Sequence, residues 1–587
     1  MFRKSLLTLA IAASAVISPL SQAESQKDIV LTQMGTHTTG EFDEGAAEIV
    51  SYDPATFRLF VINAADATVD ILDIADPANP TDFGQIDVAG DFPALAVGGV
   101  NSVAVKNGLV AVAVENDNKQ ANGWVVFYDT AGNPLKSFPA GALPDCVVFT
   151  PNGQFALAAN EGEPNGDYSV DPEGSITVID LRNGVLNATA TNAGFGAFTD
   201  VPENVRAPRP YGASLAQDLE PEYIAVSQDS RTAWVTLQEN NAIATVDIKS
   251  ATVTGIVGLG AKDHSTPGAG LDASDRDAAI NIANWPLLGT YMPDTIASFK
   301  IGKDEYLVTA NEGDAREYIT EDVTEEQCDD LGAVEFDDGE CIVYLDEIRV
   351  KDIPATAAPL PDASDDLFAD NNIGRISVIA DMGLQDSACL LANGQPGEDC
   401  VYESLHSYGA RSISIWNASG ELVSDTGDTI EQVVAATYAD ECDDAPDTEL
   451  ATRGEGTCPF NQSNDENGEF DSRSDAKGPE PEGLAVGKVH GDDYAFVGLE
   501  RVGGIMIFDI SEPASPRFVS YTNNRDFSVD DVEAAVETEN TALGDLGPEG
   551  MLFIKEDESP IGVPLLVVGN EVSGTTTVYR IDAVKSK

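Results

Sequence analysis

Residues 156–164 read A-L-A-A-N-E-G-E-P and end a predicted β-strand in an Asn-Glu-Gly sequence that recurs along the chain. Residues 310–313 repeat it as A-N-E-G, and five further strand ends are variants of it. These variants are residues 63–66, 115–117, 239–241, 500–502 and 570–572. Most ends are followed by an alternating strand, such as residues 69–74 or 175–180. One strand pattern repeated at irregular spacing predicts a β-propeller of four-stranded blades.

A hairpin precedes most of these strand ends. In residues 146–159, two apolar runs flank the turn Thr150-Pro151-Asn152-Gly153, and such turn residues between apolar runs are typical of a β-hairpin. The two strands are antiparallel, so the start of the first lies beside the end of the second. The starts carry polar side chains: Asn101, Asp145, Glu222, Asp294, Glu482 and Glu549. We therefore expect two sets of carboxylates to meet around the mouth of the propeller channel.

The repeats predict an all-β fold, a seven-bladed β-propeller in a single domain covering residues 24–587. The blades are expected at residues 44–88, 101–138, 145–190, 222–257, 294–426, 482–521 and 549–581. The last blade has three clear strands, so a strand at residues 28–36 is expected to complete it and close the ring. In the fifth blade, residues 374–380 and 411–416 are alternative third strands.

Long insertions are expected on one face, which is the acidic face. They lie at about residues 261–292, 314–373, 384–408 and 439–481. The opposite face has short turns, such as residues 76–80 and 511–516. Loops gathered on one face of a rigid scaffold are typical of a binding surface.

Residues 1–23 have the features of a secretory signal peptide. Arg3 and Lys4 precede an apolar run at residues 6–20, and small residues stand at the cleavage positions. We expect a secreted or periplasmic protein with no membrane span after cleavage. The formal net charge of −68 repels nucleic acid and anionic membranes and favours cations or a salty medium. Hydration in such a medium accounts for most of this charge, but not for glutamates at equivalent strand ends.

The seven cysteines fall into three close pairs and one single residue. Each pair lies in an acidic, Gly-rich segment, and export makes a local disulfide the expected state of each pair. The expected disulfides are Cys328–Cys341, Cys389–Cys400 and Cys442–Cys458. Cys146 is left over beside Asp145. It could be a metal ligand or a reactive thiol, but a small buried hydrophobic residue is the interpretation that we favour.

Five stretches carry a family resemblance: G-L-D-A-S-D at residues 270–275, N-W-P at 284–286, Y-M-P-D at 291–294, A-N-E-G-D-A-R-E at 310–317 and K-G-P-E-P-E-G at 477–483. Together they resemble the choice-of-anchor I family, which is related to mesenchyme-specific surface glycoproteins of biomineralising cells. The resemblance covers nearly the whole mature chain and implies a secreted or surface seven-bladed propeller. Some members are labelled alkaline phosphatases, and many carry a C-terminal anchor, which we do not expect in residues 582–587.

The first functional hypothesis is a calcium-binding propeller that serves an unknown extracellular ligand. Calcium takes six to eight oxygen ligands, and the strand-end carboxylates could supply them with help from Asn160 and Asn311. Clustered carboxylates would raise one another's pKa unless a cation lay among them. Alternatively, each glutamate caps backbone N–H groups of its own blade. The predicted ligands are Asp145, Glu161, Glu222, Asp294, Glu312, Glu482, Glu500, Glu549 and Glu571.

The alternative hypothesis is a metal-dependent phosphoesterase, in which a second metal is possible and a metal-bound water attacks phosphorus. Four bases near the motifs could hold phosphate oxygens or could instead neutralise adjacent carboxylates: Arg316, Arg473, Lys477 and Arg501. The four histidines match no zinc-ligand spacing, and there is no Walker loop or Gly-x-Ser-x-Gly elbow. The sequence leaves the ligand, the metal and the oligomeric state open.

Overall fold

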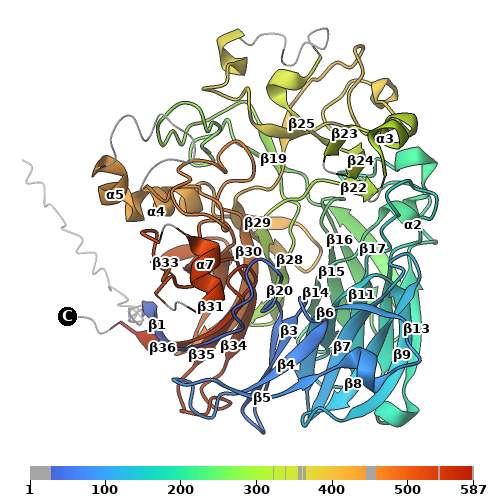
Figure 1. Ribbon diagram of the computed structural model, residues 1–587, viewed down its shortest axis with the longest axis vertical. Coiled ribbons are helices and arrows are strands. Elements are labelled where there is room, and N and C mark those ends of the chain that lie inside the picture. The colour runs from blue at the N-terminus through green and yellow to red at the C-terminus, as the bar shows by residue number, and fades with distance from the viewer. Residues whose placement is uncertain are drawn as a thin grey trace, which may run out of the picture.

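Seven four-stranded antiparallel sheets form the body of the protein in a computed structural model (Figure 1). The structure describes residues 28–320, 323–337, 339–354, 360, 365–444, 458–529, 531–539 and 542–584. The predicted signal peptide, residues 1–23, lies outside the described residues, as do residues 445–457 of one predicted insertion. Within the described chain, no helix is long and apolar enough to cross a bilayer.

The first four sheets follow one another along the chain. They are β2 (Val50–Asp53), β3 (Arg58–Asn63), β4 (Thr68–Asp73) and β5 (Thr81–Ile86); β6 (Val97–Lys106), β7 (Leu109–Asn116), β8 (Asn122–Asp129) and β9 (Pro134–Ala142); β10 (Pro144–Phe149), β11 (Phe155–Asn160), β12 (Ser175–Asp180) and β13 (Thr189–Gly194); β14 (Ile224–Val226), β15 (Thr232–Leu237), β16 (Ala242–Asp247) and β17 (Thr252–Gly258).

Of the last three sheets, one is interrupted by a long insertion between its second and third strands, and one takes its fourth strand from the N-terminus. They are β20 (Ile296–Ile301), β21 (Asp304–Asn311), β28 (Ser412–Asn417) and β29 (Leu422–Asp425); β30 (Pro481–Val489), β31 (Asp492–Leu499), β32 (Ile505–Asp509) and β33 (Arg517–Thr522); β34 (Pro548–Ile554), β35 (Leu565–Asn570), β36 (Thr575–Ala583) and β1 (Ile29–Thr38). Of the two candidate third strands of the fifth sheet, β28 takes that place beside β21.

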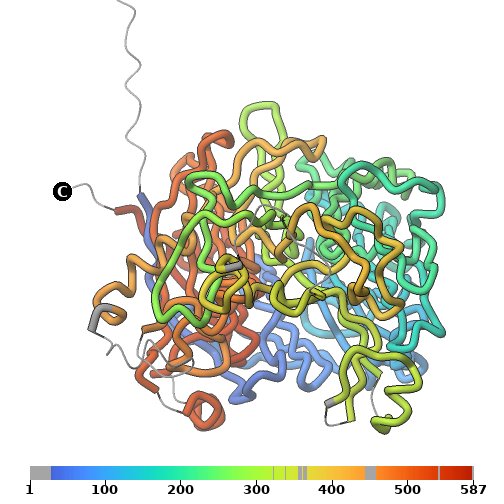
Figure 2. The backbone as a smooth tube through the Cα atoms, turned by 90° about the horizontal axis from the view of Figure 1, so that it is seen from above, coloured from blue at the N-terminus to red at the C-terminus, as the bar shows by residue number. Residues whose placement is uncertain are grey.

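The sheets are neighbours in chain order. The first strands contact one another from β2 through β6, β10, β14, β20 and β30 to β34, and β34 also contacts β2. Strand β1 pairs with β36, from Ile29 opposite Ala583 to Thr38 opposite Thr575. Figure 2 accordingly shows the blue N-terminal strand beside the red C-terminal end. The protein is an all-β protein of the β-propeller class.

The core lies between adjacent sheets, because their strands are buried on both faces. All six residues of β11 are buried, and Leu157 packs in one cluster with Val235 of the next sheet. A second cluster joins Leu59 of the first sheet to Val567 of the last. Strands covered on both faces read as nearly continuous apolar runs, which explains why the middle strands are visible in the sequence.

The insertions add two small sheets at one end of the large ones, in the upper part of Figure 1. One contains β18 (Ala261–Asp263), β19 (Leu288–Thr290), β27 (His406–Ser407), β26 (Ser377–Ile379) and β25 (Glu347–Arg349), and the other contains β22 (Glu317–Thr320), β24 (Glu340–Leu345) and β23 (Glu335–Asp337). Strand β26 is the other candidate for the fifth sheet, and it lies in the insertion.

The helices are short and lie in loops and insertions. They are α1 (Val88–Asp91), α2 (Leu215–Asp218), α3 (Glu325–Leu331), α4 (Thr429–Thr437), α5 (Ala439–Asp444) and α7 (Val532–Glu537), with 3-10 turns at η1 (Val185–Asn187), η2 (Pro210–Gly212), η3 (Val350–Asp352), η4 (Asp365–Phe368) and η5 (Ser387–Cys389).

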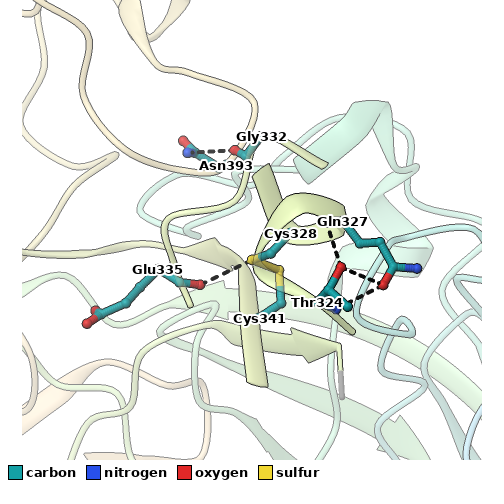
Figure 3. Close-up of a disulfide and its surroundings, with 7 residues drawn as sticks. All are labelled: Thr324, Gln327, Cys328, Gly332, Glu335, Cys341 and Asn393. Carbon is teal, nitrogen blue, oxygen red and sulfur yellow. Dashed lines mark hydrogen bonds between the residues drawn. A yellow bond between two sulfur atoms is a disulfide. The ribbon is translucent and has the colours of Figure 1, made fainter. Parts of the chain in front are cut away.

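Three disulfides lie in the insertions among the described residues. Cys328–Cys341 joins α3 to β24, beside a capping box in which the Thr324 and Gln327 side chains each accept the other's backbone N–H (Figure 3). Cys389–Cys400 and Cys442–Cys458 are also bonded, and Cys146 is free and buried. These are the pairs expected from the cysteine spacing.

Replacing Ile29 by Ala should lower the free energy of unfolding by about 2–5 kcal/mol, the usual cost of truncating a buried Ile. Ile29 is 0% exposed and packs in one cluster with Leu566 of its own sheet and Phe496 of the neighbouring sheet, so it holds β1 against that neighbour. Urea denaturation of Ile29→Ala measures the change, and Thr32→Ala, on the exposed side of β1, is the control. Equal stability of Ile29→Ala and wild type would contradict this packing.

Candidate metal centre

The strand registers bring two kinds of carboxylate to the same end of each sheet. Pro144 pairs with Asn160, and Pro548 pairs with Asn570. The next residue along each strand is acidic: Asp145 follows Pro144, Glu161 follows Asn160, Glu549 follows Pro548 and Glu571 follows Asn570. Asp145 is therefore close to Glu161, and Glu549 is close to Glu571. The predicted convergence of strand starts and strand ends therefore follows from backbone pairing.

A β-bulge recurs at the acidic strand starts. The register shifts between Pro144 and Val147 in β10, between Pro481 and Leu484 in β30, and between Pro548 and Met551 in β34. Each bulge contains the acidic residue. Bulges locally bend a strand and redirect a side chain next to functional sites. The repetition of this bulge in three sheets thus sets the direction of Asp145, Glu482 and Glu549.

The asparagines of the Asn-Glu pairs brace the strands. Asn160 donates to the backbone oxygen of Ser175 (2.9 Å), and Asn311 donates to the Ser414 hydroxyl (2.8 Å). Both are completely buried, and the cavity lining described next does not include them. Here they bond to the adjacent strand, whereas the sequence led us to expect help with metal binding.

A polar cavity of about 420 Å³ lies where the strand starts meet. Five predicted ligands line it: Asp145, Glu161, Asp294, Glu482 and Glu549. Three further glutamates that were not predicted as ligands also line it: Glu48, Glu115 and Glu163. Lys119, Cys146 and Tyr223 complete the polar or ionisable part of the wall with Asn101, Ser102 and Thr295.

Two groups of carboxylates have the spacing of cation ligands. One oxygen each from Asp294, Glu312 and Glu482 lie within 4.8 Å of one another, and the same holds for Glu312, Glu480 and Glu500. Oxygens that bind one calcium ion at 2.3–2.6 Å lie at most about 5 Å apart. Glu312 belongs to both groups. We call them the first group (Asp294, Glu312, Glu482) and the second group (Glu312, Glu480, Glu500).

Glu222 and Glu571 lie at the edge of this arrangement. Glu222 is 9% exposed, and the neighbouring charges of Glu239, Glu161 and Asp294 act on its carboxylate. Glu571 follows Asn570 at the end of β35, and burial raises its pKa to about 7. All nine predicted carboxylates therefore lie at one end of the sheets, although they do not form a single ligand shell.

Several carboxylate oxygens at the mouth lack a hydrogen-bond partner among the described residues. They are Oε2 of Glu222, Glu239, Glu482 and Glu549. A buried ionised oxygen without a partner is costly, whereas a metal ion or a proton would satisfy it. The donors are all hard oxygens, the type that calcium and magnesium prefer. The residues present thus fit a hard divalent cation.

Burial and the charges of neighbouring carboxylates raise the pKa of several carboxyls around the first cavity. Burial raises the pKa of Asp294 to about 8, with a contribution from the Glu312 charge. Burial, followed by the charges of Glu571 and Asp145, raises the pKa of Glu48 to about 8, and burial raises that of Asp145 to about 7. The pKa values of Glu161, Glu222, Glu482, Glu500 and Glu549 lie well above the usual range, first because of burial.

Three of the four predicted phosphate-binding bases surround Glu480. Arg473 lies 2.7 Å and Lys477 3.3 Å from its carboxylate, and Arg501 Nε lies 3.1 Å away. Although burial opposes ionisation, these three charges hold the pKa of Glu480 well below its usual range. Arg316 is separate: it is 3% exposed and pairs with Asp218 and Glu220.

A second cavity, of about 570 Å³, lies against these bases. Its lining includes all four of them, Arg316, Arg473, Lys477 and Arg501, together with Glu163, which also lines the first cavity. Glu347, in the inserted strand β25, lines the second cavity too. The two cavities share Glu163 in their linings.

Sequence reasoning missed Glu48 and Glu480 for different reasons. Glu48 lies two residues before β2, and its N–H bonds to Ile62 O, so it has the place of a strand start, but β2 is a short strand with a weak pattern. Glu480 stands in the K-G-P-E-P-E-G motif quoted above, in which Glu482, and not Glu480, has the strand-start position that we used to predict ligands. A count of every glutamate within two residues of a strand start would have found both.

A fold of this kind, with carboxylates gathered at one end of its sheets, defines an acidic β-propeller. The family model of the choice-of-anchor I domain matches residues 48–513, most of the chain. The protein therefore belongs to the choice-of-anchor I family.

The chain is similar to two animal proteins over part of their length. It is 30% identical over 306 residues to the mesenchyme-specific cell surface glycoprotein of Strongylocentrotus purpuratus, covering 51% of this chain and 36% of that protein. It is 26% identical over 200 residues to gigasin-3a of Magallana gigas, covering 31% and 60%. The matched region thus spans less than two thirds of either relative.

Among solved structures, the β-propeller domain of Cps50 (Swd1) from Myceliophteria thermophila has a TM-score of 0.39 and 8% identity, with 94% of this chain and 99% of that chain covered. A similarity at this level supports no inference about function.

The melting temperature of the metal-free protein should fall as pH rises from 5 to 8. Free Asp and Glu have pKa values near 4, whereas Asp145, Asp294 and Glu48 have values of about 7–8 in the folded state. Between these values the folded state binds more protons than the unfolded state, so stability decreases with pH.

Thermal melts in a chelator at constant ionic strength measure this slope. Asp294→Asn should make it shallower, because it removes one of the shifted groups. A melting temperature that stays constant or rises over this interval would show that these carboxyls are ionised in the metal-free fold.

Proposed function

We propose that this protein is an extracellular or surface calcium-binding propeller with seven blades in a closed ring. The contact of β34 with β2 and the packing of Leu59 against Val567 support closure. Pairing of β1 with β36 supports an N-terminal strand that completes the seventh blade. A closed ring protects edge strands and would hold strand ends from all blades at fixed separations.

The observation that carries the calcium proposal is the first group with its one oxygen that is unpaired within the described ranges, Glu482 Oε2. Asp294, Glu312 and Glu482 offer oxygens within 4.8 Å of one another, and Glu482 Oε2 has no hydrogen-bond partner among the described residues. In the described part of the chain, the ion pairs at the mouth involve Glu312, Asp314, Glu480 and Glu500, and none involves Asp294, Glu482 or Glu549. A divalent cation would supply the missing positive charge.

The proposed location rests on two observations. Three disulfides are present, and such bonds persist in oxidising compartments. One relative is described as a cell surface glycoprotein. The signal peptide predicted at residues 1–23 fits the same location. The insertion face, which carries β18–β19 and β22–β27, is the proposed surface for an extracellular ligand, because it adds loops and lines the second cavity beside the carboxylates.

Calcium should raise the melting temperature, and a chelator should lower it. A ligand that binds only the folded state adds about 2.7 kcal/mol at a hundredfold excess over Kd. Glu482→Gln keeps the side-chain shape and removes one charge, so it should weaken calcium binding at least about tenfold, which corresponds to about 1.4 kcal/mol.

Differential scanning fluorimetry with calcium titration tests both statements. Glu512→Gln lies in an exposed turn beyond β32 and is the matched control, which should behave as wild type. Glu347 is unsuitable as a remote control because it lines the second cavity. A calcium-independent melting curve for wild type would refute the proposed site.

The second candidate function is a metal-dependent phosphoesterase, and the bases beside the carboxylates are the observation that favours it. Arg473, Lys477 and Arg501 line the second cavity within reach of the second group. Bases and a metal on either side of a phosphate would stabilise charge during hydrolysis. However, each base already forms ion pairs with buried carboxylates, so phosphate would have to compete with them.

A chromogenic phosphate ester, assayed with calcium, iron, zinc and manganese in turn, distinguishes the two functions. If the phosphoesterase proposal holds, Arg501→Ala should reduce turnover at least about tenfold while metal content stays constant, because the guanidinium would contact phosphate oxygens. Glu512→Gln again is the control. Absence of hydrolysis with every metal would remove the enzyme and leave the calcium-binding function.

A further inference from the structure

The two carboxylate groups differ in how their charge is balanced. In the second group, Glu312, Glu480 and Glu500 are all buried and are accompanied by Lys477, Arg473 and Arg501. Three carboxylates thus face three bases. The described residues provide no such ion pair for Asp294 or Glu482 of the first group. The second group therefore resembles a cation site whose positive charge comes from the protein.

Lys477 contacts two of the three carboxylates of the second group, Glu312 and Glu480, whereas Glu500 pairs with Arg501. Lys477 Nζ lies 2.5 Å from Glu312 Oε1 and 3.3 Å from Glu480 Oε2, with Asp314 Oδ1 at 3.6 Å. A lysine ammonium is a compact point charge with three donors and no acceptor. It can satisfy several carboxylates at once, as a metal ion does, whereas the arginines contact the group from its edge through planar guanidinium groups.

The local backbone fixes this arrangement. Lys477 and Glu480 belong to one tight loop that leads into β30, and Glu480 adopts a φ of 51°, in the left-handed region that is costly for a residue with a side chain. The Glu480 carboxylate is fully buried among the three bases. Strain of this kind persists where surrounding contacts determine the conformation.

Glu312 couples the two groups. Its Oε1 accepts from Lys477, and its Oε2 accepts from Gln238 Nε2 at 3.1 Å. Each carboxylate oxygen has two acceptor positions, so Glu312 can contact Lys477 and a metal ion in the first group together. The Lys477 ammonium would then lie close to the metal ion, and the two positive charges would repel each other.

We propose that Lys477 is a built-in cation that fills the second carboxylate group, so that only the first group takes a metal ion. This inference rests on the proposed calcium site and assigns a distinct role to each half of the mouth. It separates Glu482, a ligand of the bound ion, from Glu500, a partner of protein bases. It also predicts that removing one ammonium creates a second calcium site.

Replacing Lys477 by Ala should add one calcium ion per chain, because Glu312 and Glu480 of the second group would lose the ammonium that contacts both. Equilibrium dialysis with metal analysis counts the bound ions, and isothermal titration calorimetry gives their affinities. Lys477→Arg keeps a positive charge and should bind as many ions as wild type. Lys488→Ala is the matched control, because it also removes one lysine charge. The Lys488 side chain is 57% exposed and pairs with Asp493, away from the carboxylate groups.

A second comparison does not need the Lys477 variant to fold. In the wild-type background, Glu500→Gln should keep the number of calcium ions unchanged, whereas Glu482→Gln should lose calcium. Equal calcium counts for Lys477→Ala and wild type would overturn the inference, as would loss of calcium from Glu500→Gln. Absence of calcium from the wild type alone would refute the proposed function, whereas an added ion in Lys477→Ala would still support the role of Lys477.

Discussion

Repulsion among buried carboxylates is the constraint on which the rest of this structure depends. Antiparallel pairing places Asp145 beside Glu161 and Glu549 beside Glu571, and the neighbouring sheets add Asp294 and Glu482 to the same cavity. Like charges at such distances in a poorly solvated place cannot all ionise without a compensating charge. Protons, protein bases and a divalent cation are the three ways to balance them.

The protein uses bases on one side of the mouth. Lys477, Arg473 and Arg501 surround Glu480, and Arg316 pairs with Asp218 and Glu220 farther out in the insertions. On the other side, Asp294, Glu482 and Glu549 have raised pKa values and no basic partner among the described residues. This asymmetry divides a set of similar strand ends into two parts whose charges are balanced differently.

Buried ion pairs and hydrogen bonds join the insertions that cover this site. Arg206 pairs with Asp346 and Asp381, and Tyr408 donates to Asp346 at 2.7 Å, which links segments far apart in the sequence. Arg411 likewise joins Glu431 to backbone oxygens of Ser474 and Ala476, just before Lys477. Buried pairs of this kind are weak evidence for stability, but losing one partner leaves a costly charge. Arg411 directly precedes β28, so its contacts fix the position of the loop that contains Lys477 relative to the fifth sheet.

The sequence by itself determined the repeated unit and the acidic strand ends. Apolar middle strands, turn residues and recurrent Asn-Glu endings are local patterns, so the all-β propeller class, the convergence of strand starts and ends, and the cysteine pairs could be predicted. In the fifth sheet the sequence left two strands open, because both 374–380 and 411–416 are apolar. Pairing with β21 selected β28.

Only the tertiary structure decided how the charges are shared. Nine carboxylates at strand starts and strand ends look equivalent in the sequence, yet Asp294 and Glu482 form no ion pair with a base among the described residues, whereas Glu500 pairs with Arg501. Glu480 lies only two residues before Glu482, yet it pairs with three bases, Arg473, Lys477 and Arg501. The recurrent bulges and the left-handed backbone at Glu480 set these directions. They depend on contacts between segments more than a hundred residues apart, such as Lys477 with Glu312, and a local pattern cannot encode which of several equivalent carboxylates a distant base will reach.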